Sequence, residues 1–507
     1  MSGGLVGGFA SALSLENLII ALIGASLGTL VGVLPGLGPV SAMAILLPIS
    51  VKLGTLPGLI LLAGVYYGSQ YGDSVAAILV NVPSEPPAIV IAEAGYPLTQ
   101  EGRAGAALAV AGVGSFVGAM VGLFSVAILI KPVSTLAVHL TAPDYVILIF
   151  LALLLLPSIM GVGLAPGLAA IALGLSLTAV GTDPITGGLR LTGGISAFSG
   201  GFELVPIAVG LFGMAEIFDT LLDDHQAWVV PKGVRLRNSF PSSREWLDSF
   251  FAMLRGSVAG FLLGIIPGPS LVLGPFVSRA IERRILALRE KEGVHKADLK
   301  CVSGPKAADD AAVGGSLIPL LALGIPFTPV TAILLAGLEL HGIIPGPTFL
   351  TSSTTLFWGL IAVMIIGNSA LLILNVPMIG IWIQLLKVPK VLRVGVLAAV
   401  MIVGVFAVRS SVFDLATLFV AGAAGAWFKR CGLQRSLIVL GFVLGPLLET
   451  SLGTSLISSR GSLVIFVDNP VTVVGIILIA LVIGWRTSSV VRRYKNGKAS
   501  RVGFGGN

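Results

Sequence analysis

The sequence predicts an all-α, polytopic membrane protein of about 12 transmembrane helices, with additional re-entrant half-helices and two inverted-topology repeats. Three observations lead to this fold class. Of the 507 residues, 55% are hydrophobic and only 11% are charged, whereas soluble proteins carry about 25% charged residues. Apolar runs long enough to cross a bilayer recur from one end of the chain to the other. Finally, one glycine-rich motif that ends in Pro-Gly occurs twice.

The repeated motif places a glycine at every fourth position of an apolar helix. Its first copy, GASLGTLVGVLPG, begins at Gly24, and its second copy, GSVAGFLLGIIPG, begins at Gly256. Glycines at i and i+4 leave one helix face without side chains, so another backbone can pack closely against it. A third glycine series, from Gly114 to Gly122, predicts helix packing alone. A helix that stops inside an apolar region, in corresponding places of two halves, is typical of a transporter's substrate site.

Hydropathy predicts the individual elements in order. The apolar runs of spanning length are 17–34, 56–80, 104–130, 144–160, 161–181, 203–222, 250–266, 311–337, 353–375, 391–407, 411–427 and 468–485. Four shorter runs, 39–50, 269–281, 377–388 and 436–448, favour half-helices or re-entrant arms.

Basic residues predict how these elements are oriented. They are concentrated in segments 228–247 and 282–300 and in the C-terminal tail, so the positive-inside rule places all three in the cytoplasm. The element 250–281 lies between two of these segments, so it should enter and leave by the same face as a hairpin. The corresponding element 17–50 has few charges nearby, and an odd number of spans separates the two hairpins. This arrangement predicts an inverted-topology repeat.

The predicted organisation has four parts. They are a first transport repeat (1–222, with hairpin 17–50 and broken helix 56–94), a basic cytoplasmic loop (223–249), a second transport repeat (250–464, with hairpin 250–281 and broken helix 311–345), and a last span with a basic tail (465–507).

Composition and motifs exclude several function classes. The net charge of +7 lies mostly in loops and indicates membrane topology, so no nucleic-acid partner is expected. The two cysteines, Cys301 and Cys431, have no ligand-like neighbours, which makes a metal site or a disulfide framework improbable. No P-loop, Ser-His-Asp or H-E-x-x-H pattern is present, so the chain is not expected to be an enzyme, and no cofactor is expected beyond a coupling ion.

Each Pro-Gly pair predicts an anion site. The helix that follows it exposes backbone N–H groups and the positive end of its dipole. The donors of the first half lie around Gly36, Gly38 and Ser41, and those of the second lie around Gly268 and Ser270. Kinks that serve only packing are the alternative, but four breaks in two matching sets favour a binding site.

A second break, P-x-x-P, begins at Pro83 in the first half and at Pro326 in the second. Such breaks free carbonyl groups that could coordinate Na⁺, helped by Asn81, Ser84 and Thr328. A one-residue gap aligns the G-x-S pattern before each break. That pattern ends at Ser74 in the first half and at Ser316 in the second.

Acidic residues within apolar sequence are costly and usually functional. Asp73 lies in the middle of an apolar run, and Asp309 and Asp310 precede another. The two adjacent aspartates could instead cap a helix that starts near Ala311. The candidate ion-coupling residues are Asp73, Ser74, Asn81, Asp309, Asp310 and Ser316, with further acids near the breaks at Glu85, Glu93 and Glu339.

These motifs resemble the large membrane subunit of the tripartite tricarboxylate transporters, the TctA-type family. The likeness covers nearly the whole chain and includes GTLVGVLPGLGPVSAMAILLPIS at 28–50, YYGSQYGDSVAAILVNVPSEPPAIV at 66–90, GLSLTAVGTDPITGGLRLT at 174–192 and GIIPGPSLVLGPFVSRAIERR at 264–284. The resemblance implies a first-half site at Pro35, Gly36, Gly38, Asn81 and Pro83. It implies a second-half site at Pro267, Gly268 and Pro326.

The resemblance also implies function and partners. Such a protein imports carboxylates such as citrate across the bacterial inner membrane, driven by a Na⁺ or H⁺ gradient. It would work with a periplasmic solute-binding protein and a small four-helix membrane subunit, surrounded by lipid and with a homodimer as one possible state. Its C-terminal tail would be cytoplasmic. A channel, a non-transporting scaffold and a transporter of another small organic solute remain alternatives.

Two departures from the family pattern concern acidic residues. The family usually has a glycine-like residue at the position of Asp73. It usually reads APE-x-A-N-N where this chain has GPKAADD at 304–310. Extra acids beside an anion site would repel substrate if ionised, so we expect Asp73, Asp309 or Asp310 to carry a coupling proton.

Overall fold

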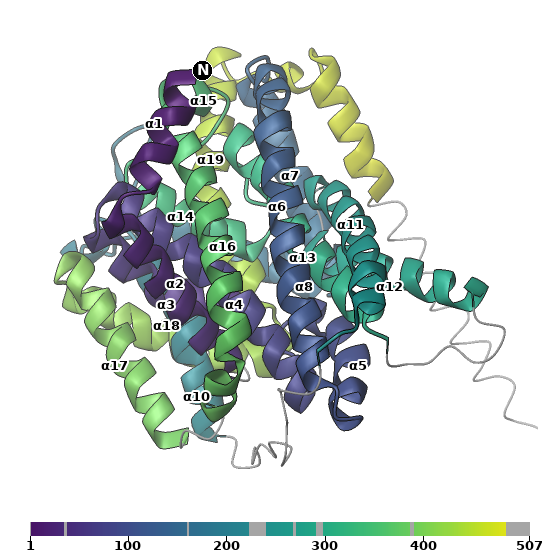
Figure 1. Ribbon diagram of the computed structural model, residues 1–507. Helices are drawn as coiled ribbons and strands as arrows, with labels where there is room; N and C mark the ends of the chain where they lie inside the picture. The colour runs from purple at the N-terminus through teal and green to yellow at the C-terminus, as the bar shows by residue number, and fades with distance from the viewer. Residues whose placement is uncertain are drawn as a thin grey trace, which may run out of the picture.

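Helices make up most of the computed structural model, which describes residues 2–34, 38–159, 162–222, 240–266, 270–289, 298–385 and 390–482 (Figure 1). The first half holds α1 (Ser2–Ala12), α2 (Leu15–Val33), α3 (Pro39–Lys52), α4 (Thr55–Val80), α5 (Pro86–Gln100), α6 (Ala104–Ala137), α7 (Ala142–Ile159), α8 (Leu164–Thr178), α9 (Leu204–Ala208), the π-helical η2 (Val209–Met214) and α10 (Ala215–Leu222). Between α8 and α9 lie the paired strands β1 (Gly181–Thr182) and β2 (Leu189–Arg190) and the 3₁₀ turn η1 (Ser196–Phe198).

The second half continues the helical pattern. It holds α11 (Ser243–Ile265), α12 (Ser270–Arg289), α13 (Lys300–Leu323), α14 (Pro329–Leu340), α15 (Phe349–Ser352), α16 (Thr354–Leu385), α17 (Lys390–Arg409), α18 (Val412–Arg430), α19 (Arg435–Ser458) and the 3₁₀ turn η4 (Leu463–Phe466). A short apolar helix, Pro470–Val482, follows. The two predicted Pro-Gly tips, most of the predicted basic loop 223–249 and the C-terminal tail lie outside the described residues.

The predicted class of multi-pass helical membrane protein is confirmed. Within the described residues, seven helical stretches are long and apolar enough to cross a bilayer. They are Leu15–Val33, Ala104–Ala137, Leu204–Leu222, Ser243–Ile265, Thr354–Ile373, Val412–Arg430 and Arg435–Ser458. The predicted total of about 12 spans and the inverted arrangement of the repeats stay predictions.

Three predicted elements have different bounds in the structure. The half-helix predicted at 436–448 is wrong, because α19 continues through Pro446 to a length of 24 residues. The separate piece predicted at 377–388 belongs largely to α16. The span predicted at 311–337 instead begins eleven residues earlier, with α13, and is divided between α13 and α14. Proline and polar residues inside these helices do not end them, since neighbouring helices satisfy the backbone.

The glycine series pack helix backbone directly on helix backbone. A Cβ added at Gly28 of α2 would lie 2.3 Å from the carbonyl oxygen of Val65 on α4. A Cβ added at Gly260 of α11 would lie 2.0 Å from the carbonyl oxygen of Ala308 on α13. The remaining contacts pair Gly24 with Leu61, Gly32 with Ser69, Gly256 with Gly304 and Gly264 with Ala312. Both copies of the motif therefore make the same contact, in the same register, with the helix that follows the hairpin.

Helices α4 and α13 are consequently enclosed by other helices. Every residue of α4 from Gly58 to Leu79, and every residue of α13 from Cys301 to Ala322, is buried. The third glycine series lies on α6 and packs on a neighbouring face of α13, where a Cβ at Gly118 would be 2.2 Å from the Ala307 carbonyl oxygen. The packing role predicted for this series is confirmed.

The glycine contacts show which residues of the two halves correspond. The two halves align without the predicted one-residue gap before the breaks. Gly72 packs on Thr29 and Gly32 of α2, and Gly315 packs in the same way on Phe261 and Gly264 of α11. The alignment of Gly72 with Gly314 is therefore wrong by one position, and Asp73 corresponds to Ser316. Both central helices end in the left-handed conformation, α4 at Asn81 with φ 55° and α13 at Gly324 with φ 71°.

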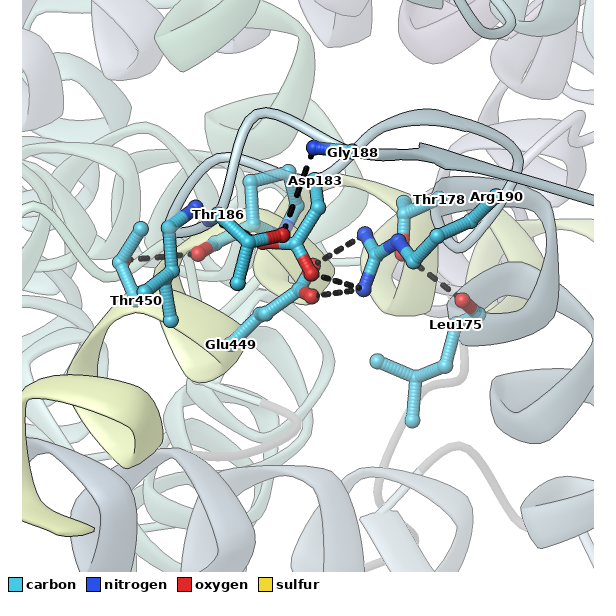
Figure 2. Close-up of polar contacts among 10 residues, drawn as sticks. Leu175, Thr178, Asp183, Thr186, Gly188, Arg190, Glu449 and Thr450 are labelled. Atoms are coloured by element: carbon cyan, nitrogen blue, oxygen red, sulfur yellow. Dashed lines mark hydrogen bonds and ion pairs between the residues drawn. The ribbon is translucent and has the colours of Figure 1, made fainter. Parts of the chain in front are cut away.

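In the hairpin between α8 and α9, Arg190 forms ion pairs both with Asp183 of the same hairpin and with Glu449 of α19 (Figure 2). The guanidinium of Arg190 forms a two-pronged ion pair with Glu449 of α19, and its Nη1 also lies 3.4 Å from Asp183 Oδ2. Asp183 Oδ1 accepts backbone hydrogen bonds from Ile185 at 2.8 Å and from Thr186 at 3.0 Å. These contacts join two distant stretches of the sequence.

The glycine packing predicts the outcome of a single methyl addition. Gly260→Ala should destabilise the protein by roughly 1–3 kcal/mol or more, because the Ala308 carbonyl oxygen cannot move without separating α11 from α13. Thermal unfolding of the detergent-solubilised protein, followed by size-exclusion chromatography, measures this. The matched control is Gly367→Ala in α16, where an added Cβ meets no heavy atom within 4 Å. Equal melting temperatures for the two variants would contradict the packing argument.

The turn at Asp183 predicts a local effect. Hydrogen bonds from the backbone N–H groups of Thr186 and Ile185 hold the pKa of Asp183 below its usual range. The carboxylate therefore supports the hairpin above the ordinary aspartate pKa, and this support is lost as the pH falls through the lowered value. Asp183→Ala should speed amide hydrogen exchange in the 183–190 segment at neutral pH, whereas Asp183→Asn should have a smaller effect. Unchanged exchange in the alanine variant would count against the turn.

Candidate functional site

The buried faces of α4 and α13 bring charged side chains together in the interior. Gln70 and Asp73 come from α4, and Lys306, Asp309 and Asp310 come from α13. Each of the four charged residues exposes at most 2% of its surface. Ionised groups at this depth require partners, because an isolated buried charge costs several kcal/mol. We call these five residues the central polar cluster.

Lys306 forms the centre of this cluster. Its Nζ lies 3.2 Å from Asp309 Oδ2 and 3.0 Å from Asp310 Oδ2, and it donates to the Gln70 carbonyl oxygen at 3.4 Å. The spacings i+3 and i+4 place both aspartates on the helix face of the lysine. From the sequence alone, Lys306 is noticeable only as part of a departure from the family pattern. The signal that could have identified it is a lone lysine, three and four positions before two acids, in an otherwise apolar segment.

The alternative role of Asp309 and Asp310 as helix caps is wrong. Helix α13 begins at Lys300, so the two aspartates lie in its third turn and not before its start. Asp309 Oδ1 and Asp310 Oδ1 are buried, and no described group meets hydrogen-bond geometry with them, although the side chains of Gln70 and Ser115 lie nearby. Each carboxyl group therefore has one oxygen that is not paired with Lys306 and that can accept a proton.

Asp73 connects the central polar cluster to the break after α4 by a hydrogen bond. Its Oδ1 accepts a hydrogen bond from the backbone N–H of Ser84 at 2.7 Å. This contact folds the segment 81–85 back along the helix that precedes it. Asp73, Lys306, Asp309 and Glu85 are all close enough to interact electrostatically.

Glu85 occupies the anion position predicted for the first Pro-Gly tip. The backbone N–H of Val40, in the first turn of α3, donates a hydrogen bond to the Glu85 carboxylate. A Cβ at Gly38 would lie 3.0 Å from Glu85 Cγ. The start of α3 thus faces a carboxylate that belongs to the protein itself. Ser41 lies buried within the same helix.

The second break follows the C-terminal end of α13, and its polar contacts differ from those of the first break. Thr328 caps α14, and its hydroxyl accepts from the Thr331 backbone N–H at 3.1 Å. Its oxygen is therefore engaged in a helix cap. The residues from Gly324 to Thr328 are buried, including Pro326, whereas Asn81 is exposed and Pro83 is partly exposed at the first break.

Three tyrosine side chains lie on the buried part of α4. Tyr66, Tyr67 and Tyr71 of α4 are all buried, so they line the interior. Tyr66 lies within electrostatic reach of Asp309, Asp310 and Glu85. With Ser316 and Thr331 it also lines a cavity of about 10 Å³. Such a space has room for about one water molecule and not for a tricarboxylate.

The remaining candidate residues hold local positions. The hydroxyl of Ser74 donates to the Gln70 carbonyl oxygen at 3.0 Å, and that of Ser316 donates to the Val313 carbonyl oxygen at 2.8 Å. Pro35, Gly36, Pro267, Gly268 and the side chain of Ser270 lie outside the described residues. Among the residues that are described, no three His, Cys, Asp or Glu side chains gather closely enough to hold a metal ion.

A larger cavity of about 320 Å³ lies away from the central polar cluster. Helices α8, α18 and α19 contribute to its walls, with Phe198, Phe202, Phe413 and Phe428 among its lining residues. None of the residues lining it is charged. It therefore offers no counter-ion to a carboxylate.

Comparison with known proteins agrees with this architecture. A family model described as "Tripartite tricarboxylate transporter TctA family" matches residues 18–440. An Agrobacterium vitis protein described as "Uncharacterized 52.8 kDa protein in TAR-I ttuC' 3'region" is 41% identical over 464 residues, which is 92% of each chain. A second one, "Uncharacterized protein in TAR-II ttuC' 3'region", is 42% identical over 212 residues, covering 42% of this chain and 87% of its own. No solved structure matches.

The Asp73–Ser84 contact predicts a difference between two substitutions. Asp73→Ala removes the acceptor of the Ser84 N–H and should lower stability by about 1–3 kcal/mol relative to Asp73→Asn, which keeps an oxygen in place. Thermal unfolding in detergent compares the two variants, and hydrogen exchange of the 81–86 segment localises the effect. Identical stability and exchange in both variants would show that this hydrogen bond does not hold the break.

Proposed function

Since this chain belongs to the tripartite tricarboxylate transporter TctA family, we propose that it is the large permease subunit of a secondary transporter that imports tricarboxylates such as citrate. It would act with a periplasmic solute-binding protein and a small four-helix membrane subunit in a bacterial inner membrane, with its C-terminal tail in the cytoplasm. Family membership supports a transporter and not an enzyme. Substrate, coupling ion and partners are parts of the proposal.

The observation that carries the proposal is the difference between two equivalent breaks. Both follow a buried central helix that ends in the left-handed conformation, yet the first break is partly exposed and the second is buried. Alternating access requires this kind of asymmetry, because a carrier exposes its binding region to one side at a time. A channel would need a continuous lined pore.

Contacts between the central helices support the inverted repeat. Lys306 donates to the Gln70 carbonyl oxygen, whereas Tyr67 and Tyr66, earlier on α4, lie within electrostatic reach of Asp310 and Asp309, which come later on α13. This order of partners supports opposite directions for the two helices, as inverted-topology repeats require.

Charge supports proton coupling at this site. Asp73, Glu85, Asp309 and Asp310 surround the single ammonium group of Lys306. If all four carboxyl groups were ionised, three negative charges would lack compensation in the interior, which is unfavourable. We therefore assign the coupling proton to Asp73 or to the Asp309–Asp310 pair, with Ser74, Asn81 and Ser316 as polar neighbours along the path.

The test is uptake into proteoliposomes that contain this subunit, its small membrane partner and its binding protein. An inward proton gradient should drive accumulation of labelled citrate or another carboxylate in a panel. Asp73→Asn and Asp309→Asn/Asp310→Asn should reduce gradient-driven accumulation to the level without a gradient while allowing exchange of internal for external substrate. Asp219→Asn, whose side chain pairs with Lys429 outside the cluster, is the matched control.

Each other outcome contradicts a defined part of the proposal. Accumulation driven by a Na⁺ gradient alone, and unchanged in the asparagine variants, would refute proton coupling. Failure of the wild-type assembly to accumulate any carboxylate under either gradient would refute carboxylate import.

A further inference from the structure

Lys306 holds a position that proton coupling alone does not explain. It has no exposed surface, and α13 contains one other basic residue, Lys300 at its start, whereas α4 contains none. A buried lysine is expensive, and an apolar residue with two asparagines would avoid that cost. A role for the positive charge itself would account for its presence.

We propose that Lys306 is the group that binds a carboxylate of the transported substrate, and that Asp309 and Asp310 hold its ammonium group while no substrate is bound. This inference rests on the proposed function, which supplies an anionic substrate. The site would take a carboxylate anion as the counter-ion of the lysine.

The first argument is electrostatic. An anion that enters beside the central polar cluster meets Asp73 and Glu85 from the first half and Asp309 and Asp310 from the second. The nearby N-terminus of α3 is already engaged by Glu85 through the Val40 N–H. Within the described part of this neighbourhood, Lys306 is the cation left to attract a carboxylate.

The second argument is the geometry of the ammonium group. Its contacts at 3.0, 3.2 and 3.4 Å are longer than the roughly 2.7–2.9 Å typical of charge-assisted hydrogen bonds. A lysine presents a mobile point charge on a flexible stem, so it can exchange one carboxylate for another. Protonation of either aspartate would weaken its hold on the lysine.

The third argument is access. Lys306 donates to the carbonyl oxygen of Gln70, three positions before Asp73, which itself holds the break through Ser84. The first break is the more exposed of the two. Movement of segment 81–85 would therefore open a route from the surface to the ammonium group.

The deciding experiment separates a binding lysine from a structural counter-ion. In the triple variant Lys306→Met/Asp309→Asn/Asp310→Asn, the lysine and the two aspartates that pair with it lose their charges together, so none of these three is left as an unpaired ion. We expect this variant to keep the wild-type melting temperature but to bind labelled citrate, or whichever carboxylate of the panel the wild type binds, roughly tenfold to a hundredfold more weakly. Wild-type affinity in the triple variant would overturn the inference.

A second variant keeps the test decisive if the triple variant does not fold. Asp309→Asn/Asp310→Asn retains Lys306 and removes its two competitors, so it should bind the same carboxylate more tightly than the wild type. Equal or weaker binding would overturn the inference. If the wild type itself binds and accumulates no carboxylate, the proposed function fails, and that result is distinct from a loss confined to the Lys306 variant.

Discussion

Close contact between helix backbones is the constraint on which this structure depends. Polar groups lie buried on α4 and α13 because α2, α11 and α6 cover these helices at distances that only glycine permits. Without water, backbone and charge must be satisfied by protein. The glycine series of the hairpins thus have a functional consequence, since they enclose the central helices tightly enough for Lys306 to meet its partners there.

The two halves share their framework and differ in the chemistry placed on it. Equivalent positions hold Asp73 in one half and Ser316 in the other, and Glu85 in one and Thr328 in the other. The charged side chains of the central polar cluster therefore gather near the first break, while the second is closed by a neutral threonine cap. The matching glycine contacts account for the common backbone, and differences at a few polar positions account for the charge at one break.

Sequence reasoning predicts the features that depend on local backbone chemistry. The glycine spacing and the Pro-x-x-Pro breaks identify the hairpins and the ends of the central helices, because glycine and proline act on the chain where they stand. It fails where the outcome depends on distant partners. The length of α19 through Pro446, the pairing of Arg190 with Glu449 and the contact of Glu85 with α3 all join segments whose proximity no local pattern records.

Lys306 shows why the role of a charged residue is harder to predict from sequence than the position of a helix break. Taken in isolation, Asp309 and Asp310 fit a helix start, because acidic residues favour that position. Within a helix that continues through them, the same residues compensate a lysine one turn earlier. A protein that moves anions must keep a positive charge available yet prevent it from remaining unpaired in the membrane. In the proposed mechanism, a lysine held by two acids that can be protonated meets both requirements, and it would link the arrival of a proton to the release of the charge that the substrate needs.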